Sequence, residues 1–334
     1  MLEFPVDYFQ NEEREGFLVD STMKTVWAAE LEVLNEVACV CGRHDLKWYA
    51  AYGTLLGAVR HQGFIPWDDD IDIWMRREDY RKLLNLLQEE LPEGYIVRAP
   101  FARKGYPEYQ VYVNNSDSIS IEPEHLQRFH GCPFYVGIDI FPLDAIPSDE
   151  KVSEMQRSIF ASALMLQQLE FQAKKGEGKQ QKKEQRDAEA AMLQIGRLLD
   201  ILKKQYGISI HRNLRQKGRE AELLKELWHT AERLPFYKGH QTGSAEPSHQ
   251  IAMYLDYLKF GKVYEDAWFA ETAYLPFEGF DIPVPGNYDE VLKAIYGDYR
   301  KPVRSDGMHD YPCYKRQLEE LRNKVAEIEK DQNK

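Results

Sequence analysis

The chain has 334 residues, of which 43% are hydrophobic, enough to fill the core of one large domain or of two ordinary ones. A net charge of −12, from 43 basic and 55 acidic residues, argues against a nucleic-acid polymer as the partner. No run of about eighteen apolar residues predicts a transmembrane span, and the N-terminus predicts no signal peptide. We therefore expect a globular, cytoplasmic protein, with peripheral contact at the inner face of the membrane left open.

The first part of the chain predicts alternating helices and strands. The expected elements are a helix over 20–44, a strand over 46–52, a short helix up to Arg60, an acidic strand over 68–73 and a helix over 78–91. Ser21 or Thr22 is expected to cap the first helix. Gly53 and Thr54 are expected to form the turn into the second helix.

The next segment, up to residue 143, is rich in aromatic and β-branched residues, which favour strands. Its clearest strands are expected over 109–113 and 134–141, and Pro142 is expected to end the second of them. Asp139 alternates with Ile138 and Ile140 in that strand. Its side chain can therefore face the acidic strand while both isoleucines pack behind the sheet.

From residue 149 to about residue 234 the apolar residues recur at helical spacing, which predicts an inserted helical subdomain. The charged segment 174–184 within it is expected to be a flexible link. The last part predicts an extended turn over 275–285, a helix over 289–295 that Gly297 stops, and a terminal helix over 314–330. The predicted organisation is a core with its N-terminal helix over 1–148, the helical insertion over 149–260, and a segment over 261–334 that completes the core.

Carboxylates are concentrated between Trp67 and Ile73. In an extended segment Asp68, Asp70 and Asp72 project to one face, and the isoleucines between them project to the other. Three neighbouring carboxylates repel one another, and such an arrangement usually persists where a divalent cation offsets the charge. Hard oxygen ligands select Mg²⁺ or Mn²⁺.

This acidic segment admits three other interpretations. An EF-hand loop starting at Asp68 is excluded, because Ile73 and Asp79 stand where that loop needs Gly and Glu. The Asp-x-Asp motif of a sugar-nucleotide glycosyltransferase fits the local spacing and stays as the alternative. An acidic edge strand that merely faces water is disfavoured by the apolar bulk of Trp67 and Trp74 on either side.

The chain resembles the LicD family, the phosphocholine transferases grouped with fukutin-type proteins in the nucleotidyltransferase superfamily. The resemblance rests on five motifs, which are YGTLLGAVRH at 52–61, IPWDDDIDI at 65–73, IDIFPLD at 138–144, FEG at 277–279 and YGDY at 296–299. It implies an α/β (α+β) fold, with a nucleotidyltransferase-like core in which helices flank a mixed β-sheet. The helical region between about 150 and 260 contributes little to the resemblance.

The resemblance also implies a set of site residues. Gly53 with Thr54, Asp70 with Asp72, and Asp139 match in order the turn, the paired acids and the third acid of the superfamily. These acids are implied to hold two divalent ions, Mg²⁺ or Mn²⁺, against a nucleotide diphosphate, and Asp68 is a further candidate ligand beside them. Further candidates for the site are His61, Glu278, Tyr296, Asp298 and His309.

Each matched residue has a chemical role to offer. Asp70 and Asp72 would hold the metal, and Asp139 would lie nearest the acceptor hydroxyl and help to remove its proton. Gly53 lets the backbone approach the phosphates, and Thr54 can donate its hydroxyl and N–H. Arg60 suits a phosphate oxygen. For Gly53 and Arg60 the structural alternatives are a simple strand-to-helix turn and a surface ion pair.

The expected reaction is transfer of phosphocholine, or of a related phospho-alcohol, with release of CMP. The donor would be CDP-choline or another CDP-alcohol, and the acceptor a cell-surface glycan or its lipid-linked precursor, such as lipopolysaccharide or teichoic acid. Trp67, Trp74, Tyr106 and Tyr109 are available to enclose a quaternary ammonium. The alternatives are a metal-dependent glycosyltransferase, which Gly53 and Thr54 upstream disfavour, and a nucleotide-binding protein without catalysis.

Overall fold

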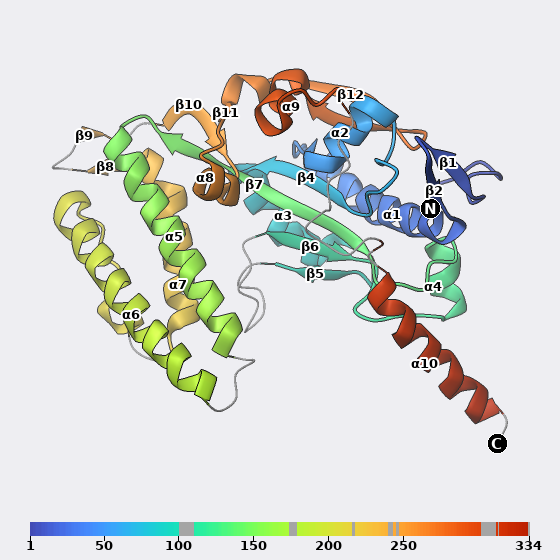
Figure 1. Cartoon of the computed structure of the whole chain (residues 1–334). Coiled ribbons are helices and arrows are strands. Elements are labelled where there is room, and N and C mark those ends of the chain that lie inside the picture. Colours follow the sequence, from blue (N-terminus) through green and yellow to red (C-terminus); the bar gives the residue numbers. More distant parts are fainter. Residues whose placement is uncertain are drawn as a thin grey trace. The chain divides into compact units, whose positions relative to one another are not determined.

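The computed structural model describes residues 1–99, 110–173, 179–215, 218–239, 243–244, 247–301, 312 and 314–332. The chain has an α+β fold in which helices flank a mixed sheet, as predicted (Figure 1). No helix in the described part is long and apolar enough to cross a membrane.

The chain divides into two compact units. The first takes its described residues from Met1–Arg98, Gln110–Pro142 and Trp268–Lys334, and the second from Ala99–Tyr109 and Leu143–Ala267. The domain boundaries predicted near residues 148 and 260 stay a prediction.

The first unit opens with a hairpin that the sequence did not suggest, formed by β1 (Glu12–Arg14) and β2 (Phe17–Val19). The predicted first helix follows as α1 (Ser21–Arg43). The residue that caps this helix is Asp20, and not Ser21 or Thr22 as predicted. The Asp20 carboxylate accepts a hydrogen bond from the Met23 N–H at 2.8 Å. A carboxylate at this position also interacts favourably with the helix dipole.

The strand-to-helix junction differs from the prediction. Strand β3 is only Tyr49–Ala50, and α2 (Tyr52–His61) begins at once, so Gly53 and Thr54 lie in its first turn rather than before it. The Ala51 N–H donates to the Asp72 carbonyl at 2.9 Å, which fixes the end of the strand. Tyr52 then takes a φ of 40°, and this left-handed residue turns the chain directly into the helix.

The acidic segment also differs. Strand β4 is Ile71–Arg76, so Asp68 and Asp70 precede it in a turn that the Asp68 N–H closes on the Ile65 carbonyl at 2.8 Å. Pro66 lies inside this turn and cannot donate to a strand ladder. Helix α3 (Arg77–Glu90) follows, close to the predicted range.

The sheet of the first unit has the strand order β5-β6-β7-β4-β3. Strands β5 (Ile96–Arg98) and β6 (Val111–Asn114) pair with each other, and the helix between β6 and β7 is α4 (Pro123–Arg128). Strand β7 (Gly137–Pro147) passes through Pro142, which was expected to end it. Its pairing with β6 stops at Ile140 and its pairing with β10 starts at Asp144, so Pro142 lies between two ladders and its missing N–H removes no bond from either.

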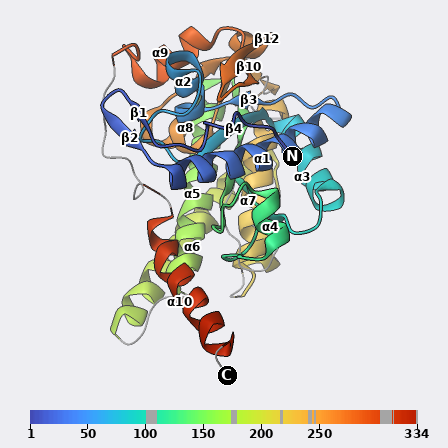
Figure 2. The same cartoon turned by 90° about the vertical axis from the view of Figure 1, so that its right-hand side faces the viewer.

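The segment predicted as an extended turn is a hairpin of β12 (Thr272–Phe277) and β13 (Phe280–Pro285). Helix α9 (Tyr288–Tyr296) ends at Gly297 as predicted, and α10 (Lys315–Gln332) is the terminal helix. Tyr314 stacks on Phe134 with ring centroids 5.1 Å apart, just before α10 begins. Beyond this anchor the helix projects away from the sheet of its own unit (Figure 2).

The second unit is mainly helical. Its long helices are α5 (Glu150–Ala173), α6 (Lys179–Ile201) and α7 (Glu220–Arg233), with α5 in contact with both others. Its remaining elements are α8 (Tyr254–Phe260), the strands β8 (Lys238–Gly239), β9 (Gly243–Ser244), β10 (Pro247–Ala252) and β11 (Tyr264–Glu265), and short turns at Leu202–Tyr206, Arg212–Arg215 and Leu234–Phe236. Residues 179–184 belong to α6 rather than to a link, while 174–178 lie outside the described residues.

Candidate functional site

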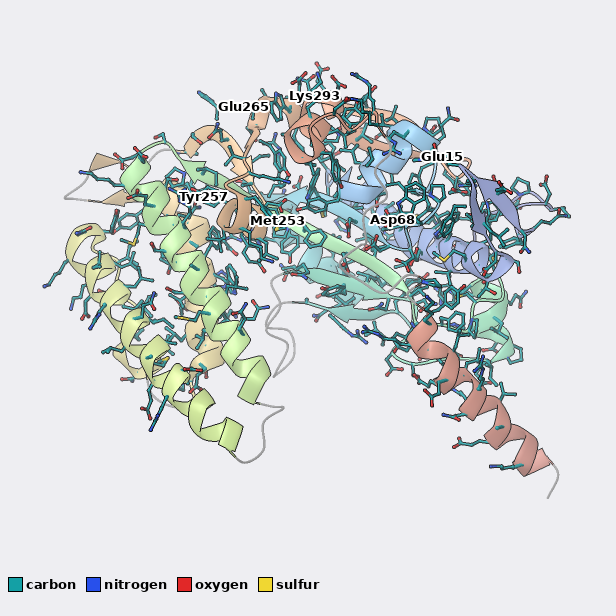
Figure 3. The ribbon with its side chains drawn as sticks, viewed as in Figure 1. Glu15, Asp68, Met253, Tyr257, Glu265 and Lys293 are labelled. Atoms are coloured by element: carbon teal, nitrogen blue, oxygen red, sulfur yellow. The ribbon has the colours of Figure 1, made fainter. Side chains whose placement is uncertain are left out.

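The four aspartates expected at the site lie close to one another. Burial and the negative charges of Asp70, Asp139 and Asp68 hold the pKa of Asp72 well above its usual value. Burial and the charge of Asp70 do the same to the pKa of Asp68. All four side chains are half-buried. The structure therefore brings together one group of carboxylates, including the labelled Asp68 in Figure 3.

Different elements position these side chains. Asp72 lies in β4 between Ile71 and Ile73, both fully buried, and Asp139 lies in β7 in the alternation that the sequence predicted. Asp68 and Asp70 come from the turn before β4. Helix α1 holds that turn, because the Trp27 indole N–H donates to the Asp68 carbonyl at 3.0 Å. A loop is thus fixed against two strands.

Gly53 is required here for space. A Cβ atom on Gly53 would stand 2.2 Å from Asp68 Oδ2 and 3.3 Å from Asp68 Cγ. Gly53 has no left-handed φ, so conformational freedom is not the reason for glycine at this position. The absence of a side chain lets the Asp68 carboxylate lie against the first turn of α2, where backbone N–H groups have no helical partner.

Thr54 has a structural role in this geometry. Its hydroxyl oxygen accepts a hydrogen bond from the Asp72 N–H at 2.9 Å, and the residue is only 2% exposed. The hydroxyl hydrogen can still donate, so the expected phosphate contact of Thr54 stays a prediction. Thr54 therefore joins α2 to β4 at Asp72, one of the four aspartates of the acidic group.

Arg60 and His61 lie at the last turn of α2. The Arg60 Nη2 atom is buried and has no hydrogen-bond partner among the described residues, so the alternative of a surface ion pair is not seen there. His61 Nε2 is 3.4 Å from Glu15 Oε1, and burial holds the pKa of this imidazole below its usual value. An unsatisfied buried guanidinium nitrogen suits an anionic ligand.

Glu278 is engaged elsewhere. Its carboxylate receives two hydrogen bonds from the Arg14 guanidinium, at 2.6 and 3.2 Å, and a third from the Phe64 N–H at 3.1 Å. Glu278 itself stands at the tip of the β12–β13 hairpin with a φ of 51°, and its N–H donates to the Gln62 carbonyl. These contacts fix the loop that leads into the acidic turn, so the structure gives Glu278 a supporting position.

The remaining candidates fall outside the acidic group or outside the described residues. Tyr296 is 43% exposed at the end of α9, and Asp298 forms an exposed ion pair with Lys301 at 3.0 Å. His309, Tyr106 and Tyr109 lie outside the described residues. Trp74 is fully buried against Tyr52 and Phe269, so it cannot enclose a choline group, while Trp67 is half-buried.

One acidic residue near the site was missed. Glu30 of α1 is buried, and its pKa is raised well above its usual value by burial and by the charges of Asp69, Asp70, Asp68 and Asp139. The signal in the sequence was a glutamate inside the apolar run of a predicted amphipathic helix. Acidic residues are almost never fully buried unless paired.

The donor atoms of the acidic group fit a hard divalent cation. All the side chains offer carboxylate oxygens, which Mg²⁺ and Mn²⁺ prefer. Among the residues that the structure describes, no three His, Cys, Asp or Glu side chains stand close enough to hold a metal ion by themselves. A site that combines one or two carboxylates with substrate phosphates, as magnesium sites commonly do, is compatible with this arrangement.

Comparison with known proteins places this part of the chain in a family. Residues 45–171 match the family described as "LicD/FKTN/FKRP, nucleotidyltransferase domain". The chain carries a LicD-family domain. This LicD-family domain contains Gly53 and the aspartates of β4, β7 and the acidic turn, whereas α1 and the β12–β13 hairpin lie outside the matched residues.

Three curated relatives share parts of the sequence. The lipopolysaccharide cholinephosphotransferase LicD of Haemophilus influenzae is 42% identical over 65 residues, which cover 20% of this chain and 24% of the relative. An uncharacterised protein of Rickettsia typhi is 36% identical over 95 residues, 27% of this chain and 31% of the relative. An uncharacterised protein of Rickettsia prowazekii is 47% identical over 55 residues, which cover 16% of this chain and 21% of the relative. The match thus spans less than a third of each of these relatives.

Proposed function

We propose that this protein is a divalent-metal-dependent transferase that moves phosphocholine, or a related phospho-alcohol, from a CDP-activated donor to a hydroxyl of a cell-surface glycan or its precursor. The observation that carries the proposal is the group of four aspartates beside Gly53, inside the LicD-family domain. The relative from Haemophilus influenzae, whose name describes a cholinephosphotransferase of lipopolysaccharide, supports the choice of group and of acceptor.

The chemistry requires few protein groups. A bound Mg²⁺ or Mn²⁺, or a pair of such ions as the resemblance to the superfamily implies, would offset the charge on the diphosphate oxygens. Asp70 and Asp72 would hold the cation, with Asp68 beside them. The first-turn N–H groups of α2 and the unpartnered Arg60 Nη2 would bind phosphate oxygens.

Asp139 is the residue assigned to the acceptor. In the proposed reaction the acceptor oxygen attacks the phosphorus that carries choline, a new P–O bond forms, and the P–O bond to CMP breaks. The hydroxyl proton passes to Asp139, which lies close enough to Asp72 for the two carboxylates to interact. We propose that the reaction takes place in the cytoplasm, at the inner face of the membrane where a lipid-linked acceptor would be present.

The test is nucleotide release from a panel of donors. Purified protein with Mg²⁺ would be incubated with CDP-choline, CDP-ribitol, CDP-glycerol, UDP-sugars and GDP-sugars, with and without a glycan acceptor. We expect CMP from a CDP-alcohol. Release of UDP or GDP from a sugar nucleotide would favour the glycosyltransferase alternative and overturn the proposal.

A further inference from the structure

Two buried glutamates lie two residues apart on α1 and have different surroundings. Glu30 and Glu32 are both 2% exposed. Glu32 Oε1 accepts a hydrogen bond from the Leu2 N–H at 2.6 Å and lies 2.7 Å from His130 Nε2. Glu30 Oε2 is buried and has no hydrogen-bond partner among the described residues. A buried carboxylate oxygen without a partner is costly, so its presence requires an explanation.

The surroundings of Glu30 are acidic. Apart from burial, the influences that raise its pKa are the negative charges of Asp69, Asp70, Asp68 and Asp139, in decreasing order. Two of these four residues, Asp70 and Asp139, are the proposed metal ligand and the proposed base. Glu30 and these aspartates are therefore close enough for their charges to interact.

Helix α1 is fixed in this position. Trp27, one turn before Glu30, donates its indole N–H to the Asp68 carbonyl at 3.0 Å. The same indole stacks on Phe64 with ring centroids 4.6 Å apart and planes nearly parallel at 2°. The proximity of Glu30 to the acidic turn thus follows from the packing of a rigid helix and does not depend on a flexible side chain alone.

We propose that Glu30 is a further acidic member of this site and that its carboxylate strengthens the binding of the divalent cation. The proposal rests on the proposed function, which requires that cation. A buried negative charge destabilises the metal-free protein and becomes favourable when a bound cation offsets it. Binding sites commonly contain groups that lower the stability of the free protein in this way. Because α1 lies outside the matched LicD-family residues, the comparisons do not assign this role.

The experiment uses Mn²⁺ together with CDP, which supplies the diphosphate oxygens that the proposed site combines with its carboxylates, and no acceptor. Thermal unfolding of wild type, Glu30→Gln and Glu32→Gln would be followed in chelator and over a series of Mn²⁺ concentrations. In chelator, Glu30→Gln should raise the Tm by about 2–4 °C, because a buried repulsion is removed. Its apparent Kd for Mn²⁺ should rise about tenfold, which corresponds to about 1.4 kcal/mol of lost attraction.

Glu32→Gln is the matched control, with the same burial, helix and chemical change. It should lower the Tm in chelator, because Glu32 has partners, and keep the wild-type Kd for Mn²⁺. A Glu30→Gln protein that is less stable than wild type, or that binds Mn²⁺ as tightly, would overturn the inference. So would wild-type protein that shows no Mn²⁺-dependent stabilisation. CMP release from the panel of donors is a separate measurement. The transferase proposal is judged by that release, whether or not Glu30→Gln changes the binding of Mn²⁺.

Discussion

The contact between Gly53 and Asp68 leads to a sharp prediction for Gly53→Ala. The added Cβ would stand 2.2 Å from Asp68 Oδ2, so the carboxylate must move by about 1 Å or more to reach an ordinary contact distance. A displacement of about 1 Å among catalytic groups can cost about 100-fold in rate. We therefore expect CMP release to fall about 100-fold.

Stability should change much less than activity. Gly53 lies in helix α2, where replacing Gly with Ala usually gains about 0.5–1 kcal/mol. Overpacking against Asp68 costs about 1–3 kcal/mol. The free energy of unfolding should thus fall by no more than about 2.5 kcal/mol. In an Asp68→Ala background the clash is absent, and the same Gly53→Ala change should stabilise the protein.

The assay is urea unfolding together with initial rates of CMP release. Gly42→Ala is the matched control, because Gly42 lies in α1 and its added Cβ would meet nothing within 4 Å. This variant should gain about 0.5–1 kcal/mol and keep the wild-type rate. Wild-type activity in the Gly53→Ala protein would refute the reasoning about Asp68.

Three further outcomes are expected. Thr54→Val leaves the buried Asp72 N–H without its acceptor and should lower the free energy of unfolding by about 1–3 kcal/mol in urea. Thr54→Ser keeps the hydroxyl and should not lower it. Equal stability of the two variants would contradict this expectation. Glu278→Ala removes one of the two carboxylates that pair with Arg14, leaving Glu12 at 2.9 Å, and should lower the free energy of unfolding by about 1–3 kcal/mol, a loss that 1 M salt should not reproduce in wild type. The pKa of Asp72 is raised in the folded protein, so on raising the pH the unfolded chain loses this proton before the folded protein does. The free energy of unfolding of the metal-free protein should therefore fall as the pH rises above about 4. Urea unfolding over a pH series should show a shallower fall for Asp72→Asn than for wild type.

The sequence predicted those parts of the site that depend on local pattern. Asp139 between Ile138 and Ile140 faces the acidic group as the period of a strand requires, and Asp72 lies between two buried isoleucines. Asp68 reaches the same group from a turn, because the strand predicted to carry it is shorter.

The parts that failed depend on contacts between distant residues. Glu278 belongs to a motif of the resembled family, but its ion pair with Arg14 joins residues 264 positions apart, which no local pattern shows. Glu30 faces the acids only because α1 packs on the turn through Trp27, 41 positions from Asp68. Pro142 was expected to end a strand, but the change of partner strand at this point removes the need for its N–H.

The most direct test of the account compares CMP release from CDP-choline by wild type, Asp72→Asn, Asp139→Asn and the exposed control Asp281→Asn, each with a verified folded spectrum. We expect Mg²⁺-dependent release by wild type and Asp281→Asn, and a loss of at least about 100-fold in the two site variants. Release that persists at the wild-type rate in Asp72→Asn or Asp139→Asn would contradict it.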